Sequence, residues 1–392
     1  MISTVGAFPS EVFRALCCGG LWCALMHAVA ANFGVTAFSM QSPVRHARMV
    51  GGQVLVVTDT RSPDHPNYGF AREIARLTTE RGATSAQPAT VIPGLAAFAA
   101  AHHGSDDVVV TGDQWWYVTT MNGMGRAAVT FVKTDGEHKK QVAPDAGFHS
   151  YVITLSGEQP RALAVSDVGD AFLAREIGWD GPLRSWRLPR SYLWPHMTAE
   201  YLPDGRIALF SDAGGGLTMF ALSDEGVVDT TVLRNLRLGE FATAIDAAGR
   251  IAVVTVRAND GTIDGTVSDV SGIGATHWHV LGHRARVDVN RPQLRVIAGT
   301  SGFVAAWINE DNGRRIEALD VSAAGPSGPV VEIGRASPRG TTAFFDVQAS
   351  GDALHFFWDD GDFLYHRQLP GSLATYASFR DLARRFCGVG GQ

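Results

Sequence analysis

Two polar stretches of the sequence supply arginines and histidines, and the first of them also supplies Tyr192 and Trp194. They are "LPRSYLWPHMT" at 188–198 and "LGHRARVDVNRPQ" at 281–293. An arginine guanidinium binds a carboxylate or phosphate with two parallel hydrogen bonds, and an aromatic face attracts a cation or packs on a sugar. The combination predicts recognition of a sugar acid or another anionic group. The residues that we assign to this site are Arg190, Tyr192, Trp194, His196, His283, Arg284, Arg286 and Arg291. The alternative is that the arginines pair with nearby acidic loops and that Trp194 packs in the core.

A third polar stretch, at 58–70, is longer than a tight turn requires. Long loops on rigid scaffolds often carry function. We therefore add His65 and Tyr68 of this loop to the predicted ligand-binding residues. The alternative is that the loop is a tolerated insertion.

Histidines and aspartates elsewhere give weaker indications of a metal. "HWH" places the imidazoles of His277 and His279 on one side of a strand, and His283 follows in the next loop. Converging imidazoles of this kind could bind zinc or manganese. Exposed histidines on an outer strand are nevertheless ordinary, and aspartates before glycine are first of all turn residues. We predict neither a metal site nor a cofactor.

Standard catalytic motifs are absent from the sequence. There is no GxSxG elbow, no HExxH and no GxxxxGK[ST] loop. Paired carboxylates leave no linear motif, so an enzyme remains the alternative: a glycoside hydrolase or polysaccharide lyase acting on an acidic polysaccharide. In that case His65, His196, His283 or Tyr192 would act as the base, and an arginine would neutralise the substrate carboxylate.

The elements that must position these loops recur along the chain. Each copy has a turn, a short apolar run, a polar gap and a second run that ends in glycine. Alternation at period two with Gly, Asp and Asn at the turns predicts β-hairpins. The closing glycines are 45 to 54 residues apart: Gly82, Gly136, Gly181, Gly226, Gly274, Gly325 and Gly371.

A repeat of about 40–50 residues with several short strands is typical of a β-propeller blade. Blades packed face to face bury a shared core and leave only short edges. We therefore predict an all-β fold, a seven-bladed β-propeller of four-stranded blades over residues 43–380, with a short C-terminal helix in the tail at 381–392. One or two β-sandwiches are the alternative, but sandwich strands do not repeat seven times in order and spacing.

Two segments need a decision between helix and strand. "YGFAREIARLTTERGA" (68–83) has the pattern of an amphipathic helix, but its alignment with the other copies predicts a strand. "SFRDLARRFCGV" (378–389) is predicted to be a short helix that caps the last blade.

The stretch "FVAAWINEDNGRRIEALDVSAAG" resembles repeats of exported bacterial β-propellers. The resemblance implies a fold and no functional residues. If the innermost strand of each blade comes first, the loops between the second and third strands and the loops between blades share one face. We call it the predicted ligand face, since all three polar stretches fall there and propellers commonly bind ligands on it.

The amino-terminal 39 residues are predicted to be a signal peptide or an N-terminal anchor. Residues 15–44 contain no Lys, Arg, Asp or Glu, and "AVA" ending at Ala30 and "AFS" ending at Ser39 are small-residue cleavage sites. An uncleaved span and a buried helix of the fold are the alternatives. Residues 33–39 could close the ring by joining the last sheet, an option that disappears if the chain is cut after Ser39.

Composition fits export and excludes one class of partner. Three of the four cysteines lie in the amino-terminal segment, so we expect no disulfide in the mature chain. The net charge of −6 argues against non-specific nucleic-acid binding, which requires a basic face. We predict a secreted, periplasmic or cell-surface monomer that binds a glycan or a protein and contacts a membrane only if the amino-terminal segment stays uncleaved.

Overall fold

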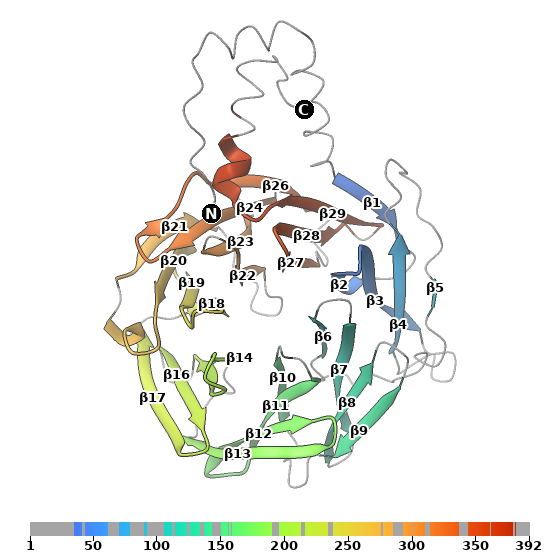
Figure 1. Ribbon diagram of the computed structural model, residues 1–392, viewed down its shortest axis with the longest axis vertical. Coiled ribbons are helices and arrows are strands. Elements are labelled where there is room, and N and C mark those ends of the chain that lie inside the picture. The colour runs from blue at the N-terminus through green and yellow to red at the C-terminus, as the bar shows by residue number, and fades with distance from the viewer. Residues whose placement is uncertain are drawn as a thin grey trace, which may run out of the picture.

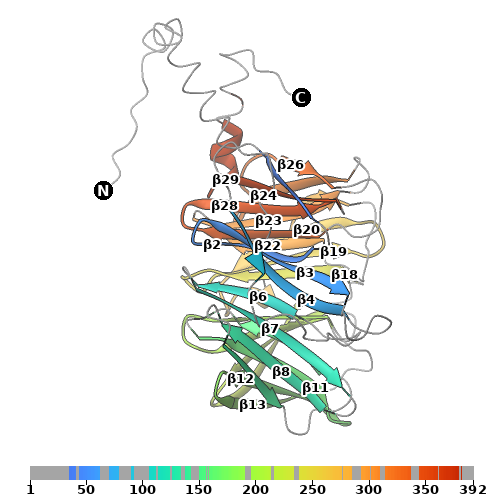
Figure 2. The ribbon, with the colours of Figure 1, turned by 90° about the vertical axis from the view of Figure 1, so that its right-hand side faces the viewer.

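In the computed structural model, seven antiparallel β-sheets are arranged radially around a central axis (Figure 1). The strands of a sheet follow one another in chain order from the axis outward, except that β1 (Val35–Ser39) completes the last sheet. Figure 2 shows the ring from the side. The predicted seven-bladed β-propeller of four-stranded blades is confirmed. The structure describes residues 35–40, 44–61, 70–78, 90–91, 106–111, 114–123, 126–133, 137–142, 150–155, 157, 159–189, 196–212, 216–233, 238–275, 277–284, 293–300, 302–309, 314–336, 344–360, 362–378 and 381.

The first three blades follow one another along the chain. Blade 1 contains β2 (Val44–Val50), β3 (Gln53–Arg61), β4 (Phe70–Thr78) and β5 (Thr90–Val91). Blade 2 contains β6 (Asp106–Thr111), β7 (Gln114–Gly123), β8 (Arg126–Lys133) and β9 (His138–Val142). Blade 3 contains β10 (Ser150–Leu155), β11 (Arg161–Asp167), β12 (Ala171–Gly178) and β13 (Gly181–Pro189).

The remaining blades continue this order. Blade 4 contains β14 (Met197–Tyr201), β15 (Ile207–Ser211), β16 (Leu217–Ser223) and β17 (Gly226–Leu233). Blade 5 contains β18 (Leu238–Ile245), β19 (Ile251–Arg257), β20 (Thr262–Ser268) and β21 (His279–His283), with the short 3-10 helix η1 (Ile273–Ala275). Blade 6 contains β22 (Leu294–Ala298), β23 (Phe303–Asn309), β24 (Arg315–Ser322), β25 (Gly325–Pro326) and β26 (Val331–Arg335). Blade 7 contains β27 (Phe345–Ser350), β28 (Ala353–Asp359), β29 (Phe363–Pro370) and β1 (Val35–Ser39).

Three closing glycines of the repeat, Gly181, Gly226 and Gly325, stand where the third strand of a blade turns into the next strand. Gly181 and Gly226 have φ angles of 134° and 131°, a region that side chains with a Cβ rarely occupy. The segment "EIARLTTERG" begins within β4 and is a strand as far as Thr78, so the repeat alignment predicted it correctly.

The core lies between blades. The buried apolar residues of the described chain form seven clusters, and each cluster joins two neighbouring blades. At two of these interfaces, a glycine on an outer strand faces a tryptophan of the next blade. A Cβ on Gly282 would lie 2.8 Å from the Trp307 ring, and a Cβ on Gly334 would lie 2.5 Å from the Trp358 ring. Larger residues at these glycines would force neighbouring blades apart.

The amino-terminal strand closes the ring. β1 pairs antiparallel with β29, from Val35 opposite Arg367 to Ser39 opposite Phe363. Residues 33–39 were expected to join the last sheet, and Val35–Ser39 do so. The predicted boundary at residue 39 is therefore corrected: the propeller begins by Val35, because a complete last blade needs this strand.

A short helix follows the last blade and binds blade 6. Residues 373–378 are helical, and Leu373 and Tyr376 are buried in the cluster between blades 6 and 7. The carboxylate of Asp320 accepts hydrogen bonds from the backbone N–H of Leu373 (3.2 Å) and Ala374 (3.0 Å). This arrangement satisfies N–H groups at the helix start. The helix begins before the predicted 378–389, most of which lies outside the described residues. No helix within the described ranges is long and apolar enough to cross a membrane.

Candidate functional site

The predicted ligand face is only partly described. Seven of the ten predicted ligand-binding residues lie outside the described residues, and the other three are His196, His283 and Arg284. The residues outside are Arg190, Tyr192, Trp194, Arg286, Arg291, His65 and Tyr68. The three described residues occupy different environments, so the structure does not bring them together as one site.

His196 lies at the start of the innermost strand of blade 4. Its backbone N–H donates to the Asp212 carboxylate (2.8 Å), and its ring meets the edge of Phe241 with centroids 5.0 Å apart. Burial lowers the pKa of His196, the charges of Asp212 and Glu240 oppose this, and the charge of Arg295 adds to it. His196 therefore lies within electrostatic reach of Glu240 and Arg295 on the two following blades.

Arg284 joins two blades and is not exposed. Its side chain has 0% exposure, and its Nη1 donates to the Glu240 carboxylate (2.7 Å) while Nη2 donates to the side-chain oxygen of Gln293. The other oxygen of Glu240 accepts the backbone N–H of Gln293 (2.6 Å) and of Leu294 (2.8 Å). The predicted role of Arg284 in ligand binding does not fit this burial, since its charge is already paired inside the interface of blades 5 and 6.

His283 is exposed at the end of the outermost strand of blade 5. It stands opposite Thr262 in the sheet. The neighbouring His277 and His279 rings are 4.8 Å apart, edge to face. Among the described residues, no group of three or more metal-ligating side chains is present.

A cluster that the sequence analysis did not find lies on the innermost strands. Asp346 of β27 accepts Arg48 of β2 in an ion pair and Arg295 of β22 at 3.3 Å. The Nε of Arg48 also donates to the carbonyl of Val108 in β6 (3.3 Å). Residues from blades 6, 7 and 1 thus meet at one carboxylate, and Arg48 extends the contacts to blade 2. We call Arg48, Arg295 and Asp346 the axial cluster.

The axial cluster places two guanidinium groups against one carboxylate. The side-chain exposures are 16% for Arg48, 28% for Arg295 and 7% for Asp346. Arg295 and Asp346 are each the second residue of their strands, at the end that joins the predicted ligand face. Arg295 is therefore the member of the axial cluster that a ligand on this face would reach most readily.

Polar side chains of the innermost strands also bind the backbone of the next blade. The Gln348 amide accepts the N–H of Met49 (2.6 Å) and donates to its carbonyl (3.1 Å) across the closure of the ring. Glu200 of β14 accepts the N–H of Ile245 (3.0 Å). Burial raises the pKa of Glu200 to about 7, although hydrogen bonds from Ile245 and Thr243 lower it. Glu200 therefore changes charge near neutral pH.

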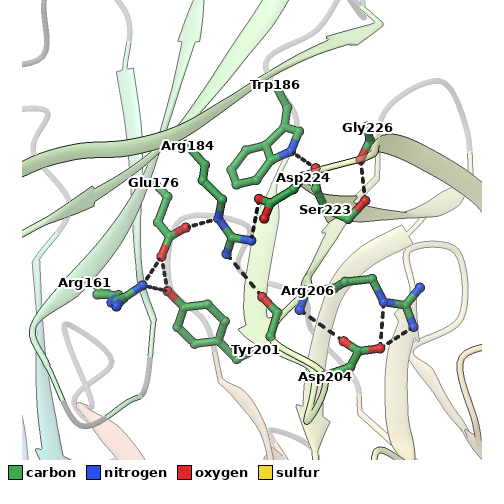
Figure 3. A network of polar contacts seen from close by, with 11 residues as sticks. Arg161, Glu176, Arg184, Trp186, Tyr201, Asp204, Arg206, Ser223, Asp224 and Gly226 are labelled. Carbon is green, nitrogen blue, oxygen red and sulfur yellow. Dashed lines mark hydrogen bonds and ion pairs between the residues drawn. The ribbon is translucent and has the colours of Figure 1, made fainter.

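The most extensive described network lies on the opposite face, between blades 3 and 4 (Figure 3). Glu176 is fully buried and binds Arg161 (2.7 Å), Arg184 (2.6 Å) and the hydroxyl of Tyr201. Burial alone would raise the pKa of Glu176, but the hydrogen bonds from Tyr201, Arg161 and Arg184 lower it below its ordinary value.

This network is suited to joining blades and not to catalysis. Burial and the neighbouring carboxylate raise the pKa of Tyr201 to about 12, so its phenol is a poor nucleophile or base. Arg184 also donates to the carbonyl of Gly205 (3.2 Å) and to Asp224 (3.3 Å), both in turns of blade 4. All three of its guanidinium nitrogens are thereby used: Nε binds Glu176 within blade 3, and the two Nη atoms bind blade 4.

No protein-family model matches the sequence, and no curated protein matches it. Solved structures share the fold. The β-propeller domain of the Trilobed protease from Pyrococcus furiosus, described as having an open velcro topology, matches with a TM-score of 0.50 and 9% identity over 84% of this chain and 98% of that chain. In the present chain, by contrast, β1 pairs with β29.

Two acylaminoacyl peptidases are similar at the same level. The one from Pyrococcus horikoshii has a TM-score of 0.51 and 10% identity over 88% of this chain and 54% of that chain. A second, in complex with a chloromethyl ketone, has a TM-score of 0.51 and 11% identity over 86% of this chain and 54% of that chain. The chain thus spans about half the length of these peptidases. At these identities, the likeness shows the β-propeller fold alone.

Proposed function

We propose that the protein is an exported binding module that recognises an anionic group of a glycan or a protein on its predicted ligand face. Arg295 of the axial cluster is the described residue that we assign to this contact. The polar loops at 188–198, 281–293 and 58–70 supply the rest of the surface.

The supporting observation is the convergence of Arg48 and Arg295 on the single carboxylate of Asp346. Two positive charges around one negative charge favour the approach of a further anion. A guanidinium that is 28% exposed, as Arg295 is, has donors within reach of a carboxylate or phosphate on the ligand. Electrostatic attraction between such groups also speeds association and weakens with salt.

Catalysis is not part of the proposal. The sequence contains no GxSxG nucleophile motif, so the activity of the peptidases named above is not carried over to this chain. Those neighbours are not glycoside hydrolases and give no support to the hydrolase or lyase alternative. Among the described residues, the buried carboxylates of Glu176 and Glu240 are already paired with arginines between blades.

A glycan array tests the proposal when neutral, uronic-acid, sulfated and phosphorylated glycans are printed beside acidic peptides. We expect retention of anionic ligands only, with affinity that falls as salt is added. Arg295→Gln should lower the affinity about tenfold or more, since a hydrogen bond to a charged group contributes about 1.5–3 kcal/mol.

Arg250→Gln is the matched control, because Arg250 is an exposed arginine that pairs with Asp246 in a turn on the opposite face. Its affinity should equal that of the wild type. Equal losses in both variants, or retention of neutral glycans only, would refute the proposal. New reducing or unsaturated ends in the products would instead support the enzyme alternative.

A further inference from the structure

The seventh blade takes its fourth strand from the beginning of the chain. β27, β28 and β29 provide three strands, and β1 occupies the outer position beside β29. All five residues of β1 are in register with β29, and the N–H of Met40 continues the pairing to the carbonyl of Asp362 (2.9 Å). The last repeat is therefore incomplete without Val35–Ser39.

β1 also contributes to the core. Phe38 is 4% exposed and packs in the cluster that joins blades 7 and 1, which includes Phe357 and Leu364. Loss of the strand would remove this side chain and expose the backbone groups of β29 along a sheet edge. Such edges are prone to pairing with other chains.

The described residues that directly follow β29 do not replace β1. Leu373 and Ala374 bind the carboxylate of Asp320 in blade 6, and Tyr376 packs between blades 6 and 7. Residues 373–376 are thus bound to blade 6 and to the interface between blades 6 and 7. The outer position of blade 7 belongs to β1.

The two candidate cleavage points lie on either side of this strand. "AVA" ends at Ala30, before β1, whereas "AFS" ends at Ser39, the last residue of β1. We infer that the leader is removed by hydrolysis of the peptide bond between Ala30 and Ala31, with water as co-reactant. The products are a leader ending in the carboxylate of Ala30 and a mature chain with Ala31 as its amino-terminal residue.

This inference rests on the export that the proposed function includes. A cut after Ala30 directly follows the apolar run, as leader cleavage requires. It leaves four residues before Val35, so the complete strand remains for the last blade. A cut after Ser39 would discard Phe38 with its strand and leave the blade with three strands.

Amino-terminal sequencing tests the inference on the full chain, expressed with a C-terminal tag in a bacterium that secretes proteins. The exported protein should begin Ala-Asn-Phe-Gly. Ala30→Arg should leave the full precursor, because the residue before the cut must be small. Ser39→Arg is the matched control and should be processed like the wild type.

Two results would overturn the inference. One is an exported, folded protein that begins at Met40. The other is normal processing of Ala30→Arg together with a block in the processing of Ser39→Arg. Export with all residues of the leader retained would overturn it as well. Glycan binding is measured on the same samples and does not depend on the cleavage point. If the amino terminus is the expected one but no anionic ligand binds, only the proposed binding function is refuted. If the chain is never exported, the export on which the proposed function and the cleavage inference both rest is refuted.

Discussion

Two buried histidines make the closure of the ring sensitive to acid. His355 of β28 and His366 of β29 are 5% and 6% exposed, and their facing nitrogens are 2.9 Å apart. The rings stack with centroids 5.2 Å apart, and His366 also stacks on Phe357 of the interface between blades 7 and 1. Across the sheet, His366 stands opposite Thr36 of β1.

Burial keeps both imidazoles neutral in the folded protein. It lowers the pKa of His355 from 6.5 to about 4. It lowers the pKa of His366 to about 3, and the charge of His355 adds to this effect. Because the unfolded histidines take up protons near pH 6.5 and the folded ones do not, the contribution of this pair to the free energy of unfolding falls as the pH decreases from about 6.5 to about 4.

The size of this effect follows from the pKa difference. One pKa unit corresponds to about 1.4 kcal/mol, so His355 alone removes about 3 kcal/mol of stability over this pH range. His366 titrates with it as a pair and adds to the loss. Domains are stable by only about 5–15 kcal/mol, so a loss of this size is readily measured.

The assay is urea unfolding followed by tryptophan fluorescence between pH 7 and pH 4.5. The double variant His355→Phe/His366→Phe removes both titrations and both partners of the hydrogen bond, and the rings retain a stacked shape. We expect stability within about 1.5 kcal/mol of the wild type at pH 7, because replacing both partners by apolar groups of similar shape costs little. Its loss of stability on acidification should be smaller by about 3 kcal/mol or more.

A matched control separates this effect from general acid denaturation. Val280→Ala changes an exposed side chain of blade 5 that carries no titratable group, and it should leave the pH dependence of the wild type unchanged. Identical pH profiles for the wild type and the double variant would refute the reasoning, since the buried pair would then carry no linkage.

Three further predictions concern other contacts of the ring. The folded chain holds a proton on Glu200 up to about pH 7, so the contribution of Glu200 to the free energy of unfolding should fall by at most about 3 kcal/mol as the pH rises from about 4.5 to 8. Glu200→Gln should remove this contribution, so its stability in urea titrations should rise relative to that of the wild type over this pH range. Arg284→Met leaves the Glu240 charge buried without its cation and should cost about 3–5 kcal/mol by denaturant unfolding, whereas Arg284→Met/Glu240→Gln should cost less; equal costs would contradict the ion pair. Phe38→Ala should lower the free energy of unfolding by about 3–5 kcal/mol and increase hydrogen exchange in β29. Val35→Ala is the control, because Val35 is 48% exposed, and it should have little effect on either measurement.

The repeat could be predicted from the sequence because it depends on local features. A turn glycine, an alternating run and a closing glycine each leave a signal within about ten residues. The same alignment identified β4 as a strand against its helical pattern, because seven copies of one unit constrain each other more than local propensity does. The start of the helix at 373 had a local signal as well, since Ser372 precedes it and serine is a preferred N-cap residue.

The contacts near the axis were not predicted because their partners are distant in sequence. Arg284 belongs to the same polar stretch of sequence as Arg286 and Arg291, and the carboxylate that pairs with it inside the interface, Glu240, is 44 residues away. Arg48 and Asp346 are 298 positions apart and meet because the ring closes. A single sequence contains no signal that relates such positions. A charged residue such as Arg284 is therefore predicted to be exposed when it is in fact buried.

The innermost strands supply a physical criterion for a binding residue in this fold. Each of these strands has an edge without a partner strand, and its backbone N–H and C=O groups require other partners. Here Glu200, Glu240 and Gln348 bind such groups in the following blade. Polar residues in these positions are therefore required for the ring itself and are not evidence of a ligand. Arg295 instead contacts the carboxylate of Asp346 and the carbonyl of Leu294 on its own strand. The Arg295 side chain is 28% exposed, whereas that of Glu240 is 6% exposed. Exposure, and not charge alone, is therefore the property that distinguishes a candidate ligand contact from a residue that holds the blades together.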